Sequence, residues 1–142
     1  MGTQQILLIV LSVIIVGIAV AVGISMFNQQ SVNSARQAIV SDMNNFAVQA
    51  QAFYKTPTSM GGAGYDNGNV TAAKLRAFIG STLTNDNGTY HIDTSTAGSV
   101  TFGVVPNESN LNAAGKCPRL TIDLTTGQIT TNTAADPMTA DQ

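Results

Sequence analysis

Charged side chains are scarce in this chain. Only 10% of its 142 residues are Asp, Glu, Lys or Arg, whereas an ordinary soluble domain carries about a quarter. Six basic residues stand against eight acidic ones, for a formal net charge of −2. This balance leaves too little cationic surface to condense on a phosphate backbone, so nucleic acid is not expected as a primary ligand.

Cysteine and histidine each occur once, as Cys117 and His91. A lone cysteine forms no intramolecular disulfide, and these two residues supply too few ligands for a four-coordinate zinc site. His91 lies two residues before Asp93, but no nucleophile motif accompanies the pair. We therefore expect no enzyme, no catalytic residues, no metal site and no cofactor, and we expect Cys117 to be a buried or half-buried small side chain.

Two loops resemble calcium-binding sequences, at residues 66–68 and 85–88. Neither has the alternating ligands and the distal glutamate of an EF-hand loop. Turn formation by Asp, Asn and Gly explains both loops more simply.

No ionisable side chain precedes Arg36, and no proline precedes Pro57. Within this stretch, residues 6–27 are apolar except for two serines and two glycines. A helix of that length rises about 33 Å, enough to cross the hydrocarbon core of a bilayer. A cleaved export signal would need a basic start and a small-residue cleavage site, which do not occur here. We expect residues 1–27 to form a helix for a membrane or for the core of a filament.

The helical pattern continues beyond the apolar run. Residues 28–54 contain neither Pro nor Gly, and Pro57 is expected to end the helix. The predicted helix is therefore about 50 residues long, or about 75 Å. Its second half is amphipathic, with an apolar stripe at a spacing of three or four residues: Val32, Ala35, Ile39, Met43, Phe46, Ala50 and Phe53.

Residues 55–142 are expected to form a globular head. A glycine-rich loop at 61–68 precedes a short helix over 70–79, closed by Gly80. Alternating apolar residues then predict an antiparallel meander of three to four strands, at residues 90–92, 100–104, 120–124 and 128–130. Residues 131–142 lack periodicity and are expected to be a surface tail. The fold class is α+β, with the long helix covering one face of the sheet and the other face wet.

An apolar helix at the N-terminus, an amphipathic extension and a small C-terminal antiparallel sheet resemble the type IV pilins and the related pseudopilins of type II secretion. At the level of residues the resemblance is confined to 1–54, where residues 1–7 align with the processed N-terminus of the family if Met1 is the first mature residue. The alternatives are that the mature end lies elsewhere and that Met1 is a true initiator. The chain has Gln5 where the family usually has glutamate; an amide accepts a hydrogen bond from a neighbour's ammonium group but cannot cancel its charge. The cysteine pair of many pilins is also missing.

The resemblance implies a structural subunit similar to a major pilin. It would be held in the inner membrane as a single-pass protein, processed by a prepilin peptidase, and polymerised by pilus assembly machinery into an extracellular homopolymer used in adhesion or motility. N-terminal methylation is also expected. Two alternatives share the apolar helix: a pseudopilin of a type II secretion system, and a bitopic membrane-anchored binding domain. The expected assembly core consists of Met1, Gln5, Ile6, Leu7, Leu11, Ile14, Ile15, Ile18, Val22 and Phe27.

Two further sets of residues carry specific expectations. Gly17 with Ala21, and Ala19 with Gly23, form small-xxx-small pairs that permit close helix approach. The family often unwinds its helix near this level, so we hypothesise unwinding between Gly17 and Gly23 in a filament. Three sequons, at Asn69, Asn87 and Asn107, are candidate glycosylation sites in a surface rich in Asn, Ser and Thr.

Overall fold

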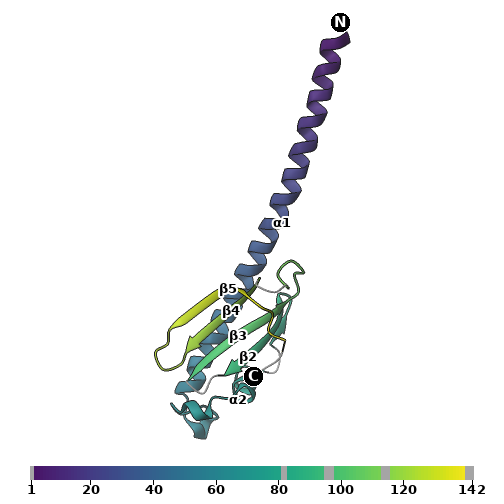
Figure 1. The fold of residues 1–142 in the computed structure, drawn as a ribbon. Coiled ribbons are helices and arrows are strands. Elements are labelled where there is room, and N and C mark those ends of the chain that lie inside the picture. Colours follow the sequence, from purple (N-terminus) through teal and green to yellow (C-terminus); the bar gives the residue numbers. More distant parts are fainter. Residues whose placement is uncertain (1, 81–82, 95–97, 113–115, 140–142) are drawn as a thin grey trace. The chain divides into compact units, whose positions relative to one another are not determined.

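The structure is a computed structural model that describes residues 2–80, 83–94, 98–112 and 116–139 (Figure 1). The chain divides into two compact units, Met1–Ser34 and Ala35–Gln142, which are described separately below. The elements along the chain are α1 (Gly2–Lys55), η1 (Thr58–Met60), η2 (Asn67–Asn69), α2 (Ala72–Ile79), β1 (Thr84–Asn85), β2 (Gly88–Thr94), β3 (Ser99–Pro106), β4 (Cys117–Asp123) and β5 (Ile129–Ala135).

The long predicted helix is confirmed as α1, which is 54 residues long and ends at Lys55, two residues before Pro57. Its first part, residues 2–34, contains no buried side chain. Neither Gly17 nor Gly23 interrupts the helix. The first unit is therefore an unbroken helix, and none of its described side chains is buried in a core.

The second unit is built on a five-stranded antiparallel sheet in the order β1-β2-β3-β4-β5. The α+β class and the meander are confirmed. The expectation of three to four strands was too low, because the two-residue β1 pairs with the start of β2 and forms a hairpin around Asp86 and Asn87. The short predicted helix is also confirmed: α2 begins after Thr71, whose side chain accepts a hydrogen bond from the Lys74 backbone N–H, and Gly80 follows it at φ 116°.

The core of the second unit lies between the C-terminal half of α1 and one face of the sheet (Figure 1). The Phe46 ring lies 5.1 Å from the Tyr90 ring and 6.0 Å from the Phe102 ring. Most of the predicted stripe is buried, although Ala47, rather than Phe46, is fully enclosed. The fully buried side chains of helix and sheet include Ile39, Met43, Ala50, Phe53, Ile92, Val100, Val104 and Leu120.

The other face of the sheet is polar, as expected, and carries a hydrogen bond of 2.9 Å between the Thr101 and Thr121 hydroxyl oxygens. At Gly103, however, the Met138 side chain packs directly against the strand. The Arg119 guanidinium also donates a hydrogen bond to the Asp136 carbonyl, at 3.2 Å. Residues 136–138 therefore lie against the sheet.

The surface tail expected at 131–142 is thus wrong for much of its length. Residues 131–135 belong to β5, and Met138 is only 6% exposed. The segment has no alternation of apolar and polar residues because its strand is held by backbone pairing with β4, which needs no apolar pattern. Residues 140–142 lie outside the described residues.

Candidate assembly surface

The first unit presents a continuous apolar surface. Between residues 6 and 27, sixteen large apolar side chains are 50% to 74% exposed. They occupy every side of the helix, because the run is apolar at nearly every position. The structure places in this surface the predicted assembly residues Ile6, Leu7, Leu11, Ile14, Ile15, Ile18, Val22 and Phe27. Gln5 is exposed on the same helix, and Met1 lies outside the described residues.

The backbone of this unit is suited to an environment without water. Every internal N–H and C=O of an α-helix is paired within the helix, which is the condition for entering lipid or a dry protein core. Of the two serines in the run, Ser12 donates its hydroxyl hydrogen bond to the Leu8 carbonyl, with an Oγ–O distance of 2.7 Å. By length and composition, α1 can cross a membrane.

The two glycines of the span leave the helix surface open. A Cβ atom at Gly17 or at Gly23 would meet nothing within 4 Å. Gly17 and Ala21 lie on one face of the helix, and Ala19 and Gly23 lie on the nearly opposite face, because each residue advances about 100°. Each pair lets another helix approach closely. The helix is continuous through both glycines in this structure, and unwinding in a filament remains a prediction.

In the second unit, a carboxylate that sequence analysis missed links the long helix to the sheet. Asp42 on α1 accepts hydrogen bonds on one oxygen from Asn85 Nδ2 (2.8 Å), Asn87 Nδ2 (2.8 Å) and the Tyr90 hydroxyl (2.7 Å). We call these four residues the Asp42 clamp. It joins α1 to the hairpin of β1 and β2. The available signal was the position of Asp42, three residues after Ile39 and four before Phe46, which places an acid beside the apolar stripe.

The clamp sets the ionisation of its members. Burial opposes the charged form of Asp42, but the hydrogen bonds from Asn87, Tyr90 and Asn85 outweigh it and hold the Asp42 pKa below its ordinary value. Burial, together with the bond to Asp42, raises the pKa of Tyr90. Both groups therefore keep their usual charge states at neutral pH, and the clamp is a charge-assisted structural contact.

The three sequons differ in their surroundings. Asn69 Nδ2 donates to the Ala63 carbonyl at 3.3 Å, and Asn87 Nδ2 donates to Asp42. Asn107 is exposed, and its amide nitrogen donates to the Asp86 carbonyl at 3.0 Å. The structure brings Asn87 and Asn107 together through a backbone hydrogen bond of 3.1 Å. Glycosylation of these residues stays a prediction.

The remaining candidates for chemistry are dispersed. Cys117 is buried, as expected, and its thiol donates to the Leu111 carbonyl at 3.0 Å. His91 and Asp93 lie two residues apart on β2 and are each half-buried. Within the described ranges, no three His, Cys, Asp or Glu side chains gather in a way that could hold a metal ion.

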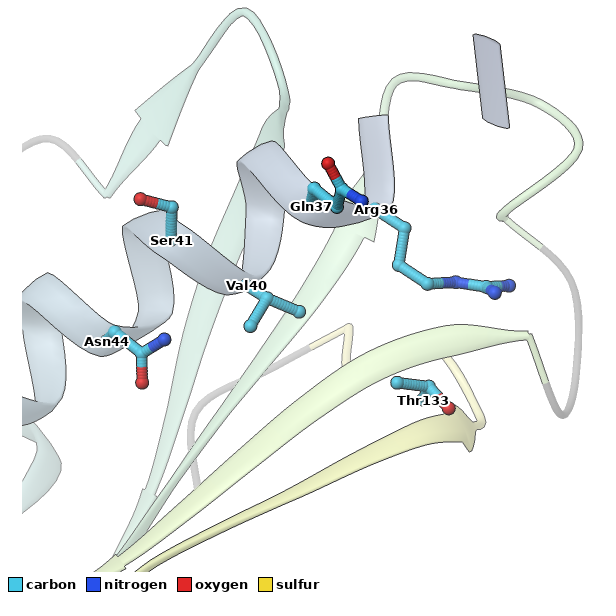
Figure 2. A pocket seen from close by; sticks show the side chains of 6 residues that line it. All are labelled: Arg36, Gln37, Val40, Ser41, Asn44 and Thr133. Atoms are coloured by element: carbon cyan, nitrogen blue, oxygen red, sulfur yellow. The ribbon is translucent and has the colours of Figure 1, made fainter. Parts of the chain in front are cut away.

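A groove of about 390 Å³ opens between α1 and β5 in the second unit (Figure 2). Val40 forms its apolar side, and the Arg36 side chain extends along it toward Thr133. Arg36 Nε is buried and makes no hydrogen bond within the described part of the chain. The other lining residues are Gln37, Ser41 and Asn44.

The chain combines a long apolar N-terminal helix with a C-terminal antiparallel sheet on which the end of that helix packs, and this architecture is pilin-like. Comparisons with protein-family models, with curated proteins and with solved structures give no match.

Proposed function

We propose that this protein is the structural subunit of an extracellular pilus-like filament and polymerises through residues 6–27 of α1. The observation that carries the proposal is the exposure of sixteen large apolar side chains on one unbroken helix. Burying a side chain of this kind stabilises by about 1.5–3 kcal/mol. The whole surface therefore favours leaving water by tens of kcal/mol, on the order of the sum of such terms.

Two environments remove this surface from water: a bilayer and a bundle of copies of the same helix. The proposal uses both in sequence, with the chain held in the inner membrane as a single-pass protein before assembly. Because lipid tails are as apolar as leucine, transfer from the membrane to the filament costs little, and close packing at Gly17 and Gly23 can decide its direction. A head-to-tail contact repeated along one direction then produces an open helical polymer.

Processing and assembly would need other proteins. A prepilin peptidase and pilus assembly machinery are proposed as partners because of the resemblance to pilins. Gln5 would hydrogen-bond to the terminal amine of a neighbouring subunit, a weaker contact than an ion pair. The proposal includes no cofactor and no catalytic activity.

The test is electron microscopy of the fraction sheared from cells that express the chain, with mass spectrometry of the same fraction to define the subunit and its N-terminus. Long uniform fibres made of this chain are expected, with a processed and methylated N-terminal residue. A membrane-bound chain without fibres would overturn the filament and leave a bitopic anchor. Short fibres seen only together with a secretion system would instead indicate a pseudopilin, and a chain lacking residues 1–27 would indicate a cleaved signal.

A further inference from the structure

The two edges of the sheet are unequal. At one edge, β1 has two residues. At the other, β5 has seven, and among the described residues it pairs only with β4 in the sheet. An edge strand presents backbone N–H and C=O groups that can pair with another chain, and proteins usually block such an edge with short strands, lysine, proline or bulges.

Most of these protections are absent from β5. Its sequence, Ile-Thr-Thr-Asn-Thr-Ala-Ala, contains no charge and no proline, and six of its seven residues are exposed. Ile and Thr are β-branched and favour extended backbone. A shift in register between β4 and β5 marks a bulge near the end of the strand, after Asn132. The regular, unprotected part of the edge is therefore residues 129–132.

Two features lie on the side of this edge that faces α1: the exposed side chain of Ile129 and the groove lined by Thr133. Ile129 is 44% exposed and pairs with Ile122, which belongs to the core face. Thr133, four residues on, lines the groove together with Val40 (Figure 2). Both features lie on the helix-facing side of β5, because Ile129 pairs with the core residue Ile122 and Thr133 lines the groove beside α1.

We infer that β5 pairs antiparallel with β5 of a second copy of this chain, with Thr131 opposite Thr131. In this register, Thr130 of each copy lies opposite Asn132 of the other. Ile129 lies just beyond this regular pairing, near the end of the other copy's edge, where Thr133 and Val40 line the groove. The contact is self-complementary, as a two-fold interface requires. A second copy is the occupant because the strand is uncharged and so does not repel itself, and because its own exposed isoleucine matches the apolar side of its own groove.

The symmetry determines where such a contact can form. An antiparallel strand pair has its two-fold axis perpendicular to the sheet, so it reverses the direction of elements that lie along the sheet, including residues 35–55 of α1 (Figure 1). Subunits of one helical polymer share a direction. A two-fold pair therefore does not form between subunits of one filament; it joins heads of two filaments, where many weak contacts add up through avidity. In this setting the inference rests on the proposed function.

The experiment compares Thr131→Cys with Thr130→Cys in the full chain, first in concentrated detergent micelles and then in sheared fibres. Two Thr131 positions face each other in the proposed pair, whereas two Thr130 positions are about 8 Å apart, beyond the reach of a disulfide. We expect the disulfide-linked dimer of Thr131→Cys to exceed that of Thr130→Cys by about fivefold or more. The unmodified chain serves as the background, because its own Cys117 is buried. Equal yields, or no dimer from either variant, would overturn the inference.

A second variant separates the edge contact from filament formation. Thr131→Lys places two like charges opposite each other and should abolish lateral bundles of fibres while single fibres persist. Thr125→Lys, at an exposed position in the turn between β4 and β5, is the matched control and should leave bundles intact. Fibres that remain bundled with Thr131→Lys contradict the edge contact alone. Dimers of Thr131→Cys in micelles without any fibres would contradict the filament alone.

Discussion

The two halves of α1 have the same backbone and opposite surroundings. Residues 6–27 expose apolar side chains on every side, whereas residues 35–55 bury one stripe and leave the opposite face polar. The first half has no core to join, while the second completes the core of the sheet. Helical structure alone therefore does not predict the environment of a helix. The distribution of apolar side chains around the helix predicts it.

A charge in the first half should have the largest effect on assembly, because it removes the fibres altogether. Ile15→Asp places a carboxylate where lipid or neighbouring helices surround it, at a cost of about 2.5–3.5 kcal/mol at the centre of a membrane span. We expect membrane retention to weaken and fibres to disappear, as measured by fractionation and electron microscopy. Ile15→Val is the matched control and should assemble. Normal fibres from Ile15→Asp would contradict the assembly role of this surface.

Loss of an aromatic ring should affect the two halves of the molecule differently. Phe102 is fully buried and Phe27 is 74% exposed. Phe102→Ala should destabilise the head by about 3–5 kcal/mol, whereas Phe27→Ala should leave its unfolding free energy unchanged. The tyrosine band of the near-UV circular dichroism spectrum, recorded on the full chain in detergent, reports on the head, because all three tyrosines lie in the second unit. Equal losses from both variants would contradict the division into two units.

The Asp42 clamp should make the head sensitive to acid. The Asp42 pKa is lower in the folded state than in the unfolded state, so its stabilisation is complete above the ordinary aspartate pKa, about 3.9. That stabilisation is lost as the pH falls through the lower folded value. Asp42→Asn should cost about 2–3 kcal/mol at neutral pH and flatten the dependence of the unfolding free energy on pH below 4, about the aspartate range.

The control for this prediction is Asp123, whose pKa is lowered by hydrogen bonds from Thr125 and Thr126 in an exposed turn. Asp123→Asn should preserve the part of the acid dependence that comes from Asp42. An acid profile of Asp42→Asn identical to that of the unmodified chain would show that the clamp does not contribute.

Glycine replacement should produce the smallest effect and again distinguish the units. Gly103→Ala drives a Cβ atom into Met138 and should destabilise the head by about 1–3 kcal/mol. Gly23→Ala meets nothing within 4 Å and should leave the stability of the head unchanged. Urea denaturation followed by near-UV circular dichroism measures both. A Gly103→Ala variant as stable as the unmodified chain would contradict the contact with Met138.

The strands that sequence analysis located share one property, an apolar residue at every second position. β2, β3 and β4 bury alternate side chains against α1, so burial on one face left a visible period. β5 buries only Ala135 among its residues, and it was therefore found only at its first two residues. Apolar alternation in the sequence marks strands that bury one face. A strand held mainly by backbone hydrogen bonds, such as β5, has no such alternation.

The candidate functional residues also divide into those that the sequence reveals and those that it does not. The exposed run of residues 6–27 was recognisable because composition alone makes it apolar on every side. The Asp42 clamp was not recognisable, because Asp42 lies 43 to 48 residues before its three partners along the chain. No local sequence pattern predicts a contact between Asn, Asp and Tyr side chains at that separation.

Composition and periodicity are enough to predict the long helix, its two kinds of surface and the class of the head, because both act locally and at every position. The number of strands, the packing of Met138 on Gly103, the Asp42 clamp and the open edge at β5 emerge only in the folded head. These depend on which distant backbone and side-chain groups meet, and that choice is made by the packing of the whole head.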